Sequence, residues 1–66
     1  MRIKLNGQEK EFVNNQTLRE IIGQIGQQNP RIIAEVNGEI IKGSRWNSTQ
    51  IKDGDAIELV TFVGGG

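Results

Sequence analysis

Apolar and polar side chains alternate near the start of the chain with the two-residue period of a half-buried β-strand. This first run covers residues 1–5 and is followed by Asn6-Gly7. That dipeptide favours a type I′ turn, because both positions of the turn need a positive φ. The sequence therefore predicts a hairpin whose second strand covers residues 8–13. In this register Lys10 lies on the same face as Ile3. That face is expected to be buried, and a charged lysine does not suit a buried position.

A helical period replaces the alternation at residues 18–27. Thr17 and Glu20 have the spacing of a capping box, which marks the start of a helix. The apolar positions follow the i, i+3, i+4, i+7 pattern of one helix face and are Leu18, Ile21, Ile22 and Ile25. So short a helix is unstable alone, so we expect this apolar stripe to pack on a sheet.

A second hairpin is predicted around Asn37-Gly38, with strands over residues 31–36 and 39–42. A loop over residues 43–50 and a final strand over residues 56–62 complete the order. Hairpins on both sides of a helix predict an α+β fold, with a mixed β-sheet of four to five strands and one helix packed across one face. We expect one domain over residues 1–62.

Four apolar side chains are predicted on the sheet face that the helix does not cover. If Ile57 and Leu59 point inward, the alternation turns Val60 and Phe62 outward. The pairing of the second hairpin places Ile33 and Ile40 on the same outer face. Such a cluster is typical of a protein-binding surface, although scattered apolar exposure is also normal.

Composition excludes several classes of function. The 66 residues carry eight basic and eight acidic side chains, so neither nucleic acid nor a membrane surface is an expected partner. Cysteine and histidine are absent, which removes disulfides, thiol nucleophiles and the commonest zinc ligands. We therefore expect no metal site and no enzyme. The sequence shows no apolar signal segment, so we expect a cytoplasmic protein.

Three further features have a functional and a structural interpretation. The glycines at 38 and 43 have P-loop spacing, but Ser44 stands where that motif needs lysine, so we reject a nucleotide site. Asp53 and Asp55 are candidate metal ligands, yet aspartates flanking a glycine are typical of a turn. Trp46 is a candidate for stacking on a ligand, and it more often covers the edge of a core.

The sequence ends in Gly64, Gly65 and Gly66, directly after an apolar strand. One interpretation is a frayed terminus of no consequence. The other is a flexible glycine tail over residues 63–66, thin enough to enter a narrow site on a partner, with the carboxylate of Gly66 as the reacting group. From Val63 onward, four extended residues reach about 13 Å.

The order of these motifs resembles the ubiquitin-like β-grasp fold, and more narrowly the ThiS family of sulfur carriers in thiamine biosynthesis. The segments that carry the resemblance span nearly the whole chain and are residues 1–7, Thr17-Leu18, residues 36–41, Arg45-Trp46, residues 52–55 and residues 63–66. Many relatives have a proline near Gly43, which this chain lacks. This departure lies far from the tail in sequence and does not change the interpretation of the tail.

The resemblance implies a carrier with no cofactor of its own. A ThiF-like adenylating enzyme would use ATP to activate Gly66 as an acyl-adenylate. Sulfur from a donor such as a cysteine desulfurase would displace AMP and leave a thiocarboxylate, which a thiazole synthase (ThiG-like) would accept. Gly64 and Gly65 would thread the partner's site, and the partner-binding surface would be Ile33, Ile40, Val60, Phe62 and Val63.

Three alternatives remain open at the level of sequence. A MoaD-like carrier for molybdopterin synthesis would share the fold, the tail and the activation chemistry. A protein modifier would be joined to lysines through Gly66. A non-carrier, ubiquitin-like interaction module would have an inert tail, so removal of Gly65 and Gly66 separates it from the carriers.

Overall fold

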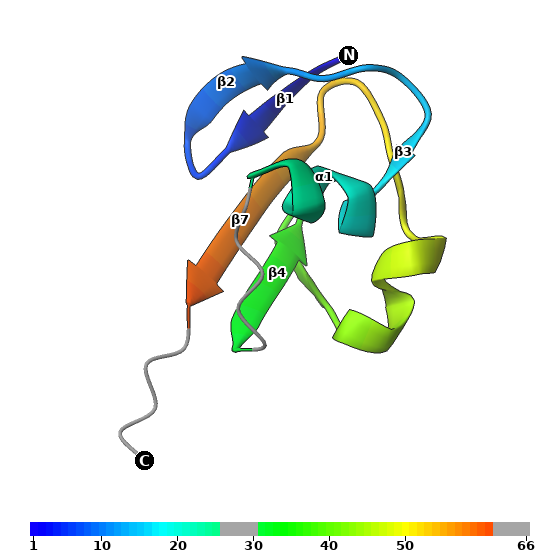
Figure 1. The fold of residues 1–66 in the computed structure, drawn as a ribbon. Coiled ribbons are helices and arrows are strands. Elements are labelled where there is room, and N and C mark those ends of the chain that lie inside the picture. Colours follow the sequence, from blue (N-terminus) through cyan, green and yellow to red (C-terminus); the bar gives the residue numbers. More distant parts are fainter. Residues whose placement is uncertain (26–30, 62–66) are drawn as a thin grey trace.

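Five strands form the main sheet in a computed structural model, which describes residues 1–25 and 31–61. In spatial order they are β2 (Gln8–Glu11), β1 (Arg2–Leu5), β7 (Ala56–Thr61), β4 (Ile32–Val36) and β5 (Glu39–Ile41). The neighbours β1 and β7 are parallel, and all other neighbouring strands are antiparallel. The helix α1 (Leu18–Ile25) lies across one face (Figure 1). The predicted mixed sheet with one covering helix is confirmed.

Both predicted hairpin turns have the left-handed backbone that their sequences favour. The φ angles are 51° at Asn6 and 84° at Gly7, and 52° at Asn37 and 84° at Gly38. The predicted registers are also confirmed, including the pairing of Lys10 with Ile3. Lys10 creates no conflict, because every residue of β2 is exposed. This edge strand lies outside the buried core, so a charged side chain on either of its faces remains in contact with solvent.

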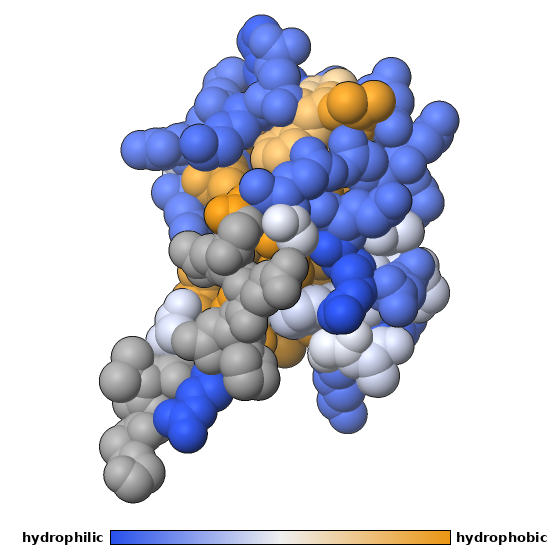
Figure 2. Space-filling view, in the orientation of Figure 1, coloured by the Kyte–Doolittle hydropathy of each residue, from blue (hydrophilic) through white to orange (hydrophobic). Residues whose placement is uncertain are grey.

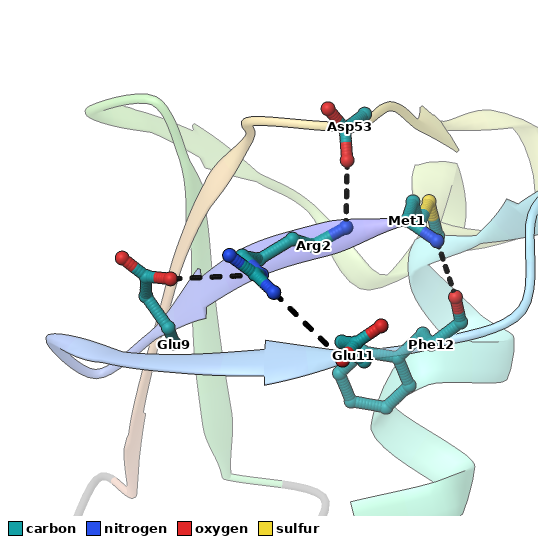
Figure 3. Close-up of polar contacts among 6 residues, drawn as sticks. All are labelled: Met1, Arg2, Glu9, Glu11, Phe12 and Asp53. Atoms are coloured by element: carbon teal, nitrogen blue, oxygen red, sulfur yellow. Dashed lines mark hydrogen bonds and ion pairs between the residues drawn. The ribbon is translucent and has the colours of Figure 1, made fainter.

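The first hairpin continues for one residue pair beyond β2, which ends at Glu11 and not at residue 13 as predicted. The amide N–H of Phe12 donates to the carbonyl of Met1 at 2.8 Å. In return the N-terminal ammonium of Met1 donates to the carbonyl of Phe12 at 2.6 Å, as Figure 3 shows. Met1 and Phe12 are partly buried against the core. The predicted strand is therefore correct in register and two residues shorter in extent.

The helix begins with the predicted capping box. The amide N–H of Glu20 donates to Oγ1 of Thr17 at 3.2 Å, and the amide N–H of Thr17 donates to Oε1 of Glu20 at 2.8 Å. Leu18, Ile21 and Ile22 are buried against the sheet, as the apolar stripe predicts. The structure gives the helix as Leu18–Ile25, and the predicted residues 26 and 27 lie outside the described residues.

Loss of the cap is expected to destabilise the whole domain. We expect Thr17→Ala to lower the free energy of unfolding by about 1 kcal/mol, because the amide N–H of Glu20 loses its acceptor, Oγ1 of Thr17. Urea unfolding followed by circular dichroism measures this. Thr17→Ser keeps the hydroxyl and serves as the control. Equal loss in the serine and alanine variants would show that the hydroxyl has no capping role.

Residues 43–50 differ from the predicted loop. Gly43–Ser48 forms a 3-10 helix, η1, and the short strands β3 (Gln16–Thr17) and β6 (Gln50–Ile51) pair as a second, two-stranded sheet. Two hydroxyls stabilise the end of η1, since Ser48 Oγ and Thr49 Oγ1 donate to the carbonyl of Arg45 at 3.1 and 2.7 Å. Strands of two residues are too short to show a hydrophobic period, so the sequence pattern did not reveal them.

The core lies between α1 and the inner face of the main sheet. Among residues 1–25 and 31–61, ten buried apolar side chains belong to it, and they are Ile3, Leu5, Leu18, Ile21, Ile22, Ile32, Ala34, Ile51, Ile57 and Leu59. The predicted burial of Ile51, the isolated apolar residue before the last turn, is confirmed. None of the helices in residues 1–25 and 31–61 has the length and apolar character needed to cross a bilayer.

Candidate functional site

The sheet face opposite α1 carries exposed apolar side chains on its central strands. Along β7, Ile57 and Leu59 are buried, so the alternation turns Val60 outward, where it is 52% exposed. Ile33 of β4 lies directly opposite Val60 in the antiparallel ladder and is 39% exposed. The predicted outward orientation of these two residues is confirmed, and both are available to a partner.

Ile40 extends this apolar surface to the edge of the sheet. It lies on β5, directly opposite Glu35 of β4, and is 63% exposed. Glu35 is two residues after Ile33 on the same strand, so Ile40 is a diagonal neighbour of Ile33. We call Ile33, Ile40 and Val60 the open-face cluster. The strand registers alone bring these three residues together from three separate strands.

The remaining predicted site residues lie outside the described residues. They are Phe62, Val63, Gly64, Gly65 and Gly66, which follow directly in sequence after Thr61, the last residue of β7. Val60 therefore stands three residues before Val63 in the sequence. The strand that carries one member of the open-face cluster is the strand that leads to the predicted tail.

The two turn aspartates accept hydrogen bonds from within the domain. Oδ1 of Asp53 accepts the amide N–H of Arg2 at 2.7 Å. Oδ2 of Asp55 accepts the amide N–H of Lys52 at 2.8 Å, and its Oδ1 accepts from Nδ2 of Asn37 at 3.0 Å. The structural interpretation of these carboxylates is confirmed, because each joins segments that are distant in sequence.

Trp46 covers the edge of the core, as its structural interpretation predicts. The side chain is partly buried against the core, and its indole N–H donates to the carbonyl of Ile41 at 2.9 Å. This bond fixes the ring over the end of β5. Trp46 is therefore engaged within the domain, and we do not assign it a ligand.

A group of oppositely charged side chains lies on β1 and β2. Arg2 points between two carboxylates, with nitrogen–oxygen distances of 3.7 Å to Glu9 and 3.9 Å to Glu11 (Figure 3). Together with Lys10 these residues line an open hollow of about 360 Å³. Exposed ion pairs of this kind contribute little stability. Because the charges compensate one another, the hollow has no net attraction for an ion of either sign.

The sequence patterns missed an exposed valine at the N-terminal end of the molecule. Val13 is 76% exposed and follows Phe12 directly. Figure 2, drawn from the helix side, shows apolar surface at this end among mainly hydrophilic residues. The prediction had placed Val13 at the end of a strand, whereas β2 ends at Glu11. Its exposure follows from that earlier end of the strand.

Comparison with known proteins finds similarity over the whole chain. A sequence model of the ThiS family matches residues 3–66. The sulfur carrier protein ThiS of Bacillus subtilis (strain 168) is 34% identical over 65 residues, covering 97% of this chain and 98% of that protein. The crystal structure of the thiamine biosynthesis protein ThiS from Geobacter metallireducens has a TM-score of 0.89 and 29% identity, with full coverage of both chains.

A larger enzyme also contains a similar segment. A thiazole synthase of Paramagnetospirillum magneticum (strain ATCC 700264 / AMB-1) is 33% identical over 66 residues, which are the whole of this chain. Those residues are 20% of that enzyme, so the chain spans about a fifth of its length. The similarity therefore does not extend to the remaining four fifths of that enzyme.

Proposed function

The chain belongs to the ThiS family and is a sulfur carrier protein of thiamine biosynthesis, and we propose that the carboxyl carbon of Gly66 holds the sulfur. As a carrier, it is a substrate of other enzymes and not a catalyst. The fold is the ubiquitin-like β-grasp expected from the resemblance. The matched carriers act in thiamine biosynthesis, so they favour that pathway over the molybdopterin alternative.

Activation of Gly66 requires a partner, because a carboxylate is a poor electrophile. In the proposed step, a carboxylate oxygen of Gly66 attacks the α-phosphate of ATP on a ThiF-like adenylating enzyme, and pyrophosphate leaves. Sulfur at the oxidation level of sulfide, released by a thiol reductant from the persulfide of a donor such as a cysteine desulfurase, then attacks the carbonyl carbon. A carbon–sulfur bond forms, the bond to AMP breaks, and a thiocarboxylate remains. ATP is bound by the partner and not by this chain.

The tail and the folded domain have separate tasks in this proposal. Residues 1–62 form the domain that docks, and residues 63–66 form the tail that enters the partner's active site. Gly64 and Gly65 keep the tail thin, since glycine has no side chain. The four residues of the tail reach about 13 Å from the end of the domain when extended. The folded domain thereby stays outside a buried reaction site.

The open-face cluster is the observation that carries the docking part of the proposal. Ile33, Ile40 and Val60 are exposed together on one face, and Val60 lies on the strand that leads to the tail. Apolar side chains grouped in this way are typical of protein interfaces. We propose that Phe62 and Val63 extend this surface, so that docking and entry of the tail occur on the same side.

A thiazole synthase is the proposed acceptor of the sulfur. The matched thiazole synthase holds a segment similar to this whole chain within its own polypeptide. Joining a carrier to an acceptor raises the effective concentration of one near the other. That arrangement supports a thiazole synthase as the partner that accepts sulfur from this carrier.

Intact mass measurement tests the proposed chemistry. The protein, ending at Gly66, is incubated with the adenylating enzyme of the same organism, ATP and inorganic sulfide. We expect the mass to rise by the difference between sulfur and oxygen, and fragmentation to place the change on Gly66. Omission of ATP is the control and is expected to leave the mass unchanged. A complete reaction mixture without this mass change would contradict the proposal.

A further inference from the structure

The open face divides into two halves that differ in how their charges are compensated. In the half formed by β1 and β2, Arg2 lies within 3.7 Å of Glu9 and 3.9 Å of Glu11. This arrangement of one cation between two anions is visible in Figure 3. The half formed by β7, β4 and β5 contains the open-face cluster and two further carboxylates. Among the described residues, neither of these two carboxylates forms an ion pair.

Those two carboxylates belong to Glu35 and Glu58, which lie directly opposite each other on β4 and β7. Like charges directly opposite in an antiparallel ladder destabilise it. Neither residue forms an ion pair within the part of the chain that the structure describes. Lys4, on the adjacent strand β1, lies opposite Ala56 and also forms none. Residues 26–30 and 62–66 contain no lysine or arginine, so they supply no compensating charge.

Apolar side chains flank this pair of glutamates on both sides. The next outward-facing pair along the same ladder is Ile33 with Val60, and Ile40 lies opposite Glu35 on the other side of β4. A partner that covers the open-face cluster must therefore cover the carboxylates as well. Removing an ionised carboxylate from water is strongly unfavourable unless an opposite charge meets it. The apolar cluster thus requires a cationic group in whatever surface covers it.

We infer that the docking surface of the thiazole synthase places an arginine or lysine side chain between Glu35 and Glu58, within an otherwise apolar contact. This inference rests on the proposed function and specifies the chemistry of the partner. Arginine suits the position best, because its planar guanidinium donates to two carboxylates at once. The repulsion between the glutamates in the free carrier is relieved on docking, which favours the complex.

Neutralising the pair separates its role in binding from its role in the fold. We expect the double variant Glu35→Gln and Glu58→Gln to bind the thiazole synthase of the same organism about tenfold more weakly than the original chain. Its affinity is also expected to depend less on NaCl concentration, because fewer charges contribute. The same variant is expected to unfold about 1–4 °C higher, since the like-charge repulsion is gone. Isothermal calorimetry and thermal unfolding measure the two effects.

The matched control is the double variant Glu9→Gln and Glu11→Gln. It changes the net charge by the same amount and on the same sheet face, but in the half formed by β1 and β2, where Arg2 compensates the carboxylates. We expect this variant to bind the thiazole synthase with the affinity of the original chain. Equal affinity and equal salt dependence in both double variants would overturn the inference while thiocarboxylate formation on Gly66 still supports the proposed chemistry. If the original chain does not bind the thiazole synthase, both the proposed acceptor and this inference are wrong.

Discussion

Removing Gly65 and Gly66 is expected to abolish sulfur loading of the carrier. The shortened chain still ends in a carboxylate, at Gly64, so the reacting group itself is not lost. Its reach, however, falls by about 7 Å, which is two extended residues. The carboxylate then no longer meets ATP in the activating enzyme while the domain is docked. Intact mass after incubation with that enzyme, ATP and sulfide measures the loaded fraction.

Thermal unfolding provides the control for this truncation. Within β7, which ends at Thr61, Leu59 is the last buried residue, and we expect removal of Gly65 and Gly66 to leave the unfolding midpoint unchanged. Gly65→Ala keeps the length of the tail and adds one methyl group. It therefore separates the effect of tail length on sulfur loading from the effect of tail width. A truncated chain that accepts sulfur as fast as the original would show that Gly66 is not the loading site. Failure of both the original and the truncated chain to accept sulfur would instead favour the inert-tail alternative.

Ile57→Ala is expected to remove most of the stability of the domain. Ile57 is fully buried on the central strand, opposite Leu5 on one side and Val36 on the other. Truncating a buried isoleucine to alanine costs about 2–5 kcal/mol. A domain of this length has a total stability of about 3–10 kcal/mol. We therefore expect a large fall in the urea midpoint, or a chain without a cooperative transition.

Ile40→Ala is the matched control for this core substitution. It makes the same chemical change on a strand, at a residue that is 63% exposed. We expect a change in unfolding free energy within about 0.5 kcal/mol. Similar losses at both positions would mean that Ile40 is buried in solution or that Ile57 is not in the core. Either result would contradict the assignment of inner and outer faces.

Much of the fold was predictable because its turns have strong local signals. Asn6-Gly7 and Asn37-Gly38 set two hairpin registers, and each register then fixed which side chains share a face. The exposure of Ile33 and Ile40 follows from the second register, so their outward orientation was predicted correctly. Thr17 and Glu20 similarly marked the start of the helix.

The features that the sequence did not predict depend on contacts between distant segments. The β3–β6 pair joins Gln16 to Ile51 across the chain, and two residues per strand show no hydrophobic period. Likewise, the opposition of Glu35 and Glu58 depends on the pairing of β4 with β7, which no turn sequence specifies. Alternation along each strand gives both glutamates an outward orientation. Only the sheet order placed them side by side.

The most direct test of sulfur carriage follows an isotope from the carrier into the product. The carrier is loaded with ³⁴S as its Gly66 thiocarboxylate, purified, and added to the thiazole synthase and its remaining substrates with unlabelled sulfide present. We predict that the thiazole product contains ³⁴S in proportion to the carrier consumed, and that Gly66 returns to a carboxylate. A labelled carrier that persists while unlabelled thiazole accumulates would contradict the central claim that this chain delivers the sulfur.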